Sequence, residues 1–303
     1  MGAQDDPDRN GVARPWLGTG LIAFAAVSFG IVTTLSRLAY DGGGNPLTLL
    51  VLRFAAFVAV AGVLLMARRR PLRLTRSGFR GSLWLAAAMF AMSAGYLTAV
   101  AYIPVGLAAI IFYSFPLLVG VVASASGREP MTVAKAAALV VAFAGLALAL
   151  GPSVGGLDAR GVAAAVVAAL GITVTIVFSG AVTRGNDSLV VNFWTNLWML
   201  VAASACVAAW GTFALPVSGL GLAGALGATL CYVVAFVAWF AGMRFLAPAR
   251  TAMLFNIEPV VSIAAAALVL GERLSAVQLV GVAAVLAAIA ARTLGDRPRP
   301  GRA

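Results

Sequence analysis

The chain contains no histidine, two cysteines and few charged residues. Charged side chains make up 10% of its 303 residues, whereas soluble domains usually have about a quarter. Without histidine, no imidazole can relay protons or bind zinc. Cys206 and Cys231 are too few for a disulfide framework, and they lack the spacing of metal ligands. No Gly-rich loop ending in Lys-Ser or Lys-Thr is present, so the sequence carries no nucleotide-binding signature, and we expect no cofactor.

Apolar residues dominate what remains. They make up 62% of the chain, and the mean hydropathy is +1.01. Apolar stretches of about 20 residues recur, and each could cross a hydrocarbon core of about 30 Å as a helix. We therefore predict an all-α integral membrane protein with ten transmembrane helices, at 18–38, 46–67, 81–101, 105–125, 131–151, 159–180, 188–210, 219–242, 246–270 and 273–293.

The chain repeats itself at an offset of 143 residues. Pro116 and Pro259 have this offset, and so do Glu129 and Glu272, although the chain has only three glutamates. Each copy holds five predicted helices, an odd number, so the two copies must insert in opposite senses. The sequence thus predicts two inverted five-helix repeats around a central site. The predicted segments are a tail at 1–17, repeats at 18–151 and 159–293, and a second tail at 294–303.

The net charge of +11 could indicate affinity for nucleic acid, but the arginines gather at helix ends, and we expect no nucleic-acid partner. A basic loop beside apolar spans is instead the orientation signal of a protein in the cytoplasmic (inner) membrane. Alternation then places both termini in the cytoplasm. The equivalent segment of the second copy, 211–223, has no basic residue, as inverted repeats require. The basic loop carries Arg68, Arg69, Arg70, Arg73, Arg76 and Arg80.

Two segments resemble a known family. "FNIEPVVSIAAAALVLGERLSAVQLVGVAAVLAAIA", residues 255–290, closely resembles the second-repeat signature of the EamA-type permeases of the drug/metabolite transporter superfamily. "FYSFPLLVGVVASASGREPMTVAKAAALVVAFAGLAL", residues 112–148, is similar but has Arg128 between the usual neighbours Gly and Glu. The resemblance implies ten transmembrane helices in two repeats, with a pathway that opens alternately to each side. Members of the family mostly export amino acids or other small metabolites.

Three residues inside the spans suggest a transport pathway. Pro116 and Pro259 lie near mid-span in equivalent helices, where a missing N–H and a clash with the carbonyl four residues earlier should kink the helix. These kinks are either hinges of the pathway or static packing features. Glu258 lies near the bilayer centre, where an acid usually faces a cavity. It could titrate during transport or contact a substrate amine; the alternative is a structural carboxyl that is neutral or is bonded to Asn256 or to a neighbouring helix.

Other polar residues in the spans leave alternatives open. Arg53 lies about 10 Å inside its helix. It could bind a carboxylate or phosphate, pair with Glu258, snorkel outward or cap loop carbonyls. Its counterpart in the second copy is Asn196. Glu129 and Glu272 each precede a helix and are interpreted as structural caps. Further pathway candidates are Asn256, Tyr96, Trp239, Tyr113 and Ser114, among which Tyr96 and Trp239 are again 143 residues apart.

These observations favour a secondary transporter that exports a small organic metabolite, such as an amino acid, by alternating access. The alternatives are a proton-coupled importer and a membrane-embedded lipid-modifying enzyme. An enzyme would need a catalytic constellation, and three glutamates without histidine offer little for one, so we predict no enzymatic activity. The expected partners are a small-molecule substrate, protons and membrane lipids, and a homodimer is left open.

Overall fold

The structure is a computed structural model that describes residues 15–103, 105–127, 131–150, 158–211, 213–270 and 275–295. Within these ranges the chain forms helices and no strands. Seven segments are long and apolar enough to cross a membrane, and two shorter apolar helices accompany them. The twelve helices of the described ranges are α1 Pro15–Asp41, α2 Pro46–Ala67, α3 Arg76–Tyr102, α4 Val105–Phe112, α5 Phe115–Ala125, α6 Val133–Leu150, α7 Ala159–Thr183, α8 Ser188–Trp210, α9 Gly219–Gly242, α10 Pro248–Leu254, α11 Ile257–Leu270 and α12 Ala276–Gly295.

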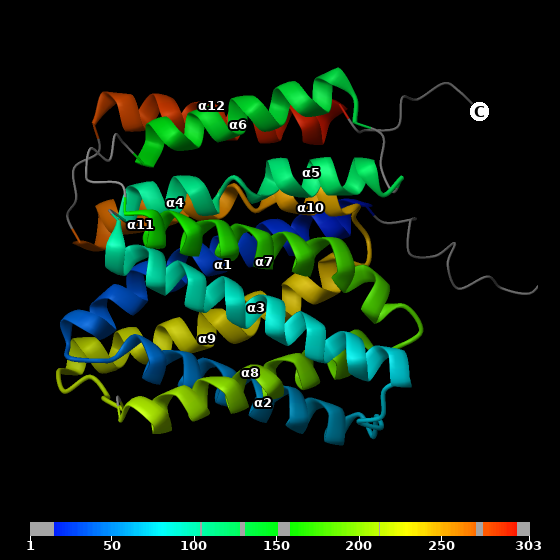
Figure 1. Ribbon diagram of the computed structural model, residues 1–303, viewed down its shortest axis with the longest axis vertical. Coiled ribbons are helices and arrows are strands. Elements are labelled where there is room, and N and C mark those ends of the chain that lie inside the picture. Colours follow the sequence, from blue (N-terminus) through cyan, green and yellow to red (C-terminus); the bar gives the residue numbers. More distant parts are fainter. Residues whose placement is uncertain are drawn as a thin grey trace, which may run out of the picture.

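The helices follow the 143-residue repeat of the sequence. Shifting α2 by this offset gives 189–210, and α8 is Ser188–Trp210. The same shift carries each of the first six helices onto one of the last six. In Figure 1, α1 and α7 run in opposite directions across the bundle, and so do α2 and α8. Equivalent helices therefore enter the fold in opposite senses.

Contacts between the two halves dominate the packing. The helix α1 packs along α9, and its equivalent α7 packs along α3. At one side of the bundle α2 packs against α8, and at the other side α6 packs against α12 (Figure 1). A Cβ built on Gly95 in α3 would lie 2.7 Å from the Ala164 carbonyl oxygen, so this glycine lets α3 and α7 approach closely.

The two helices predicted at 105–125 and 246–270 are interrupted rather than kinked. In the first, α4 ends at Phe112 and α5 begins at Phe115; in the second, α10 ends at Leu254 and α11 begins at Ile257. Each break lies two or three residues before a proline, Pro116 or Pro259, which supplies no N–H for the carbonyl four residues earlier. In the second break the Phe255 carbonyl accepts instead from the Glu258 N–H at 3.0 Å. This shorter bond satisfies the carbonyl at the break.

Helix α3 begins five residues earlier than predicted. The Thr75 side chain accepts a hydrogen bond from the Gly78 N–H at 3.0 Å, which is an N-cap. Two of the six loop arginines, Arg76 and Arg80, therefore lie in the helix. The predicted caps Glu129 and Glu272 lie outside the described residues.

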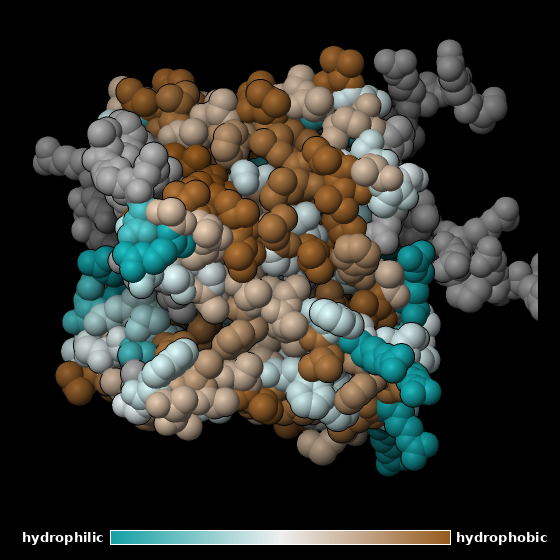
Figure 2. All heavy atoms as spheres, viewed as in Figure 1, coloured by the Kyte–Doolittle hydropathy of each residue, from teal (hydrophilic) through white to brown (hydrophobic). Residues whose placement is uncertain are grey.

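The apolar side chains on the surface form a band. Figure 2 shows hydrophobic residues across the middle of the visible face, with hydrophilic residues gathered at its two lateral edges. The segment 68–75 lies at one of these edges, which we call the arginine end; the start of α1 and the end of α12 lie at the same end in Figure 1. Such a band, together with the seven apolar spans, is typical of a multi-pass membrane protein. Exposed apolar side chains include Val63, Leu226, Leu230, Leu268 and Val280.

Candidate functional site

The two helix breaks meet at Glu258. Glu258 lies in the first turn of α11, and Tyr113 lies in the turn between α4 and α5. The Tyr113 hydroxyl donates a hydrogen bond to the Glu258 carboxylate. The Tyr96 side chain of α3 lies close enough to interact electrostatically with Glu258, and its ring packs on Phe112 with centroids 5.3 Å apart. Three predicted pathway residues from both repeats therefore come together.

Helix α1 lies against this acid. A Cβ built on Gly30 would lie 2.6 Å from the backbone oxygen of Glu258 and 2.8 Å from Cβ of Val261, so only glycine fits the present packing. One turn further along, the hydroxyls of Thr33 and Ser262 hydrogen-bond at 2.6 Å. The contact between α1 and α11 thus fixes the backbone that carries Glu258.

An aromatic cluster extends from the second break. The ring of Phe29 on α1 lies with its centroid 6.0 Å from Trp239, 6.1 Å from Tyr232 and 6.2 Å from Phe255. Trp239 and Phe255 are 5.3 Å apart. The indole N–H of Trp239 is buried and has no hydrogen-bond partner among the described residues. These rings fill the space between the break and the side of the bundle formed by α2 and α8.

Arg53 belongs to a second polar group beyond these rings. Its side chain, from α2, is 9% exposed and donates a hydrogen bond to the Ser36 hydroxyl of α1. A further hydrogen bond joins it to Tyr40, also on α1. Tyr232 lies near the guanidinium, and its hydroxyl donates to Asn196 Oδ1 at 3.0 Å. Arg53 and Asn196, equivalent positions of the two repeats, therefore approach the same tyrosine.

The alternatives for Arg53 can now be narrowed. At 9% exposure its side chain does not snorkel to the surface. Within the described part of the chain, no ion pair joins Arg53 to Glu258. Its observed partners are side-chain hydroxyls rather than loop carbonyls.

The remaining predicted residues take structural positions. Asn256 is buried in the turn between α10 and α11, and no hydrogen bond joins its side chain to Glu258, both of which are described residues. The Ser114 hydroxyl donates to the Ile111 carbonyl at 2.7 Å, so it caps the break between α4 and α5. Asn196 donates to Asn192 Oδ1 at 2.8 Å within α8.

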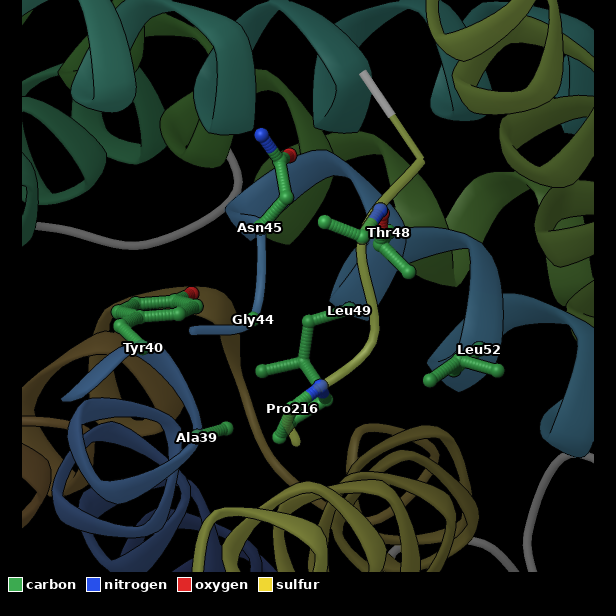
Figure 3. Close-up of a pocket in the computed structure, with 9 residues that line it drawn as sticks. Ala39, Tyr40, Gly44, Asn45, Thr48, Leu49, Leu52 and Pro216 are labelled. Carbon is green, nitrogen blue, oxygen red and sulfur yellow. The ribbon is translucent and has the colours of Figure 1, made fainter. Parts of the chain in front are cut away.

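A narrow pocket opens at the end of the bundle opposite the arginine end. It is too narrow to hold a water molecule. Figure 3 shows Tyr40, Leu49 and Pro216 around it, from α1, α2 and the segment before α9. Two backbone hydrogen bonds tie these segments together beside the pocket, from Asn45 to Ala214 at 3.1 Å and from Val217 to Gly42 at 2.9 Å.

Comparison with known proteins identifies the family. The model of the EamA-like transporter family matches residues 16–151 and 159–293, nearly the whole chain and one match for each repeat. The chain belongs to the EamA-like transporter family. The family lies within the drug/metabolite transporter superfamily, so the resemblance drawn from the sequence is confirmed. An EamA-like transporter binds small-molecule substrates and is surrounded by lipid.

A solved structure shows the same fold. A crystal structure titled only as that of a protein is 21% identical to this chain, with a TM-score of 0.77, and the match covers 92% of this chain and 99% of the other. At this identity the likeness concerns the fold alone. No curated protein matches the chain. The site of this EamA-like chain therefore has to be judged from its own residues.

Several site residues were not among the sequence candidates, and two of them stand out. Phe29 and Tyr40 lie on α1, and the first is central to the aromatic cluster while the second bonds Arg53. A signal was present, because Phe29, Ser36 and Tyr40 are spaced by seven and four residues, which places them on one face of a helix. The spacing identifies the face but not its neighbours, which belong to α2 and α9.

Proposed function

We propose that this EamA-like protein is a secondary transporter of the cytoplasmic membrane that exports a small organic metabolite by alternating access. Ten transmembrane segments in two inverted repeats form it, with α4 and α5 acting as one broken span and α10 and α11 as another. The arginine end faces the cytoplasm, because basic residues beside apolar spans are retained there. We propose export rather than import because most members of the family that the sequence resembles are exporters.

The hydrogen bond between Glu258 and Tyr113 carries the proposal. It joins the unwound points of the two repeats, which is where transporters built from inverted repeats place their substrate and coupling-ion sites. A carboxyl group inside a span is costly unless it functions or is paired. Glu258 would exchange a proton, or bind the solute, as the two repeats move.

The broken helices support alternating access. The half-helices α5 and α10 pack against each other at the arginine end (Figure 1). Within the described residues no comparable packing joins α4 and α11, the corresponding half-helices at the opposite end. One end of the pathway is thus closed more tightly than the other. Exchange of the two repeat conformations would reverse this difference, which is how inverted repeats alternate access.

The experiment is counterflow in proteoliposomes with a panel of labelled amino acids and small metabolites. We expect uptake of at least one panel member by the wild type, and loss of proton-driven flux in Glu258→Gln, whose side chain has nearly the same shape but cannot carry charge. Asp41→Asn is the matched control, because Asp41 is 55% exposed and pairs with Arg37 at the surface. Such an exposed ion pair contributes little to stability.

The same vesicles separate the alternatives. Sorting the protein by orientation and imposing a proton gradient in each direction distinguishes export from proton-coupled import. Unchanged proton-driven flux in Glu258→Gln would remove this carboxyl from the mechanism. No flux of any solute, together with turnover of lipid, would favour the enzyme alternative and overturn the transporter proposal.

A further inference from the structure

Arg53 is a buried charge without a counter-ion in the described part of the chain. It lies about 10 Å into α2, and its side chain is 9% exposed. Its partners are the hydroxyls of Ser36 and Tyr40, and its Nε–H is buried with no partner. Burying a cation among neutral groups is costly, and an anion within contact distance would remove most of that cost.

The carboxylates among the described residues do not fill this role. The described residues include four, and each has another partner. One lies beside the second break, and the other three lie at the ends of helices. The pairs are Asp41 with Arg37, Asp158 with Arg160, Asp187 with the backbone N–H of Leu189, and Glu258 with Tyr113.

The surroundings of Arg53 combine neutral polar groups with rings. Tyr232 and Asn196 are buried and hydrogen-bonded to each other at 3.0 Å. The ring of Phe54, one residue after Arg53, lies 5.8 Å from that of Tyr232. Tyr40, which bonds Arg53, also lines the narrow pocket of Figure 3 together with Leu49, one turn before Arg53.

We propose that Arg53 binds the carboxylate of the solute, so that the transported metabolite is an organic acid or zwitterion with an apolar body. This inference rests on the proposed transport function and names the substrate class. The guanidinium offers N–H donors in a planar fork that suits a carboxylate, including the free Nε–H. The apolar body packs on the rings of Phe54 and Tyr232.

The test uses three probes that share one phenyl ring and differ in charge: benzoate, benzyl alcohol and benzylamine. Binding to the purified protein in detergent is measured at pH 7 as the shift of the thermal unfolding midpoint with probe concentration. Benzoate is expected to raise the midpoint, whereas the neutral and cationic probes have no comparable effect. Arg53→Gln is expected to weaken the apparent affinity for benzoate by about 10- to 100-fold, the usual loss for a hydrogen bond to a charged group.

Two further variants separate binding from folding. Arg53→Lys keeps the charge but loses the planar fork, so it should retain part of the affinity. Ser36→Ala keeps Arg53 and removes its hydroxyl partner. This variant tests the proposal if the Arg53 variants do not fold. Its benzoate affinity should change several-fold, with no gain for benzylamine. Arg37→Gln is the control, since it removes an arginine of α1 that is 66% exposed.

Three results would overturn the proposal. The first is equal binding of benzoate and benzylamine. The second is an unchanged benzoate affinity in both Arg53→Gln and Ser36→Ala. The third is that none of benzoate, acetate and 3-phenylpropionate shifts the unfolding midpoint of the wild type. The binding assay needs no flux. Charge-selective binding without transport would therefore refute the transport function alone, and transport without charge selectivity would refute the role of Arg53 alone.

Discussion

Replacing Gly30 with alanine tests how the structure positions Glu258. Gly30 lies where α1 crosses α11, and an added Cβ would lie 2.6 Å from the backbone oxygen of Glu258. An ordinary contact for a Cβ begins at 3.4 Å, so the two helices would have to separate by at least 0.8 Å, the difference of these distances. Because the nearest atom belongs to the backbone, no side-chain rotation can relieve the clash.

The cost can be estimated from two opposing effects. Overpacking a close helix contact usually costs about 1–3 kcal/mol. Alanine in place of glycine inside a helix gains about 1 kcal/mol. We therefore expect Gly30→Ala to lose up to about 2 kcal/mol of stability. A separation of the helices also shifts Glu258 relative to Tyr113, and loss of that hydrogen bond should lower flux by about tenfold or more.

The assay compares two alanine variants of the same helix. Gly20 also lies inside α1, but a Cβ built there meets nothing within 4 Å. Gly20→Ala should be as stable as the wild type or slightly more stable, with normal flux. The unfolding midpoint in detergent and the flux in proteoliposomes are measured for both variants, so the helix-propensity effect is common to them.

A double variant sharpens the prediction. Cβ of Val261 is the second atom that an alanine at position 30 would meet, at 2.8 Å. Val261→Ala leaves the backbone oxygen of Glu258 in the path of the new Cβ, so it should not rescue Gly30→Ala. If Gly30→Ala matched Gly20→Ala in midpoint and flux, or if Val261→Ala restored it fully, the tight contact with the Glu258 backbone would not position the acid.

Two further predictions concern the hydrogen bond of the site and a charge at the surface. Tyr113→Phe removes the hydroxyl that donates to Glu258 and should lower flux by about tenfold while the protein stays folded. The control is Tyr102→Phe, which changes a 43% exposed tyrosine and should transport normally. Equal flux in the two variants would contradict the role of Tyr113. Hydrogen bonds from Arg160 lower the pKa of Asp158 from 3.8 to about 2. Because the folded pKa lies below the unfolded one, this stabilisation is present above about pH 4 and is lost as the pH falls towards 2. The unfolding midpoints of the wild type and of Asp158→Asn should therefore converge between pH 4 and pH 2, and a constant difference across that range would contradict the assignment.

The helices and the repeat were predictable from the sequence because both depend on local or periodic signals. Apolar length set the spans, and the 143-residue offset matched α2 with α8 and α5 with α11. The breaks were predicted only as kinks. A proline in the sequence indicates that an N–H is missing. It does not indicate whether the carbonyl four residues earlier finds another donor within a bent helix or whether the helix ends. At Phe255 a bond from the Glu258 N–H closes the turn and the helix stops.

The contacts of the candidate site could not be predicted from the sequence, for a different reason. The repeat pairs Tyr113 with Asn256, whereas the hydrogen bond joins Tyr113 to Glu258. A contact between non-equivalent positions leaves no trace in an internal duplication. Arg53 was a similar case, since its depth was predictable but its hydroxyl partners on α1 were not.

The two repeats share a backbone but not a chemistry, and this difference bears on the mechanism. In the proposed mechanism the two like halves exchange conformations, and their likeness would give the two states similar energies. If the site were equally symmetric, a solute would have two equivalent places to bind. Instead each proposed contact residue has an unlike counterpart, so in the proposed mechanism the acid comes from the second repeat and the cation from the first. The counterpart pairs are Glu258 and Phe115, Arg53 and Asn196, Tyr113 and Asn256, and Tyr96 and Trp239.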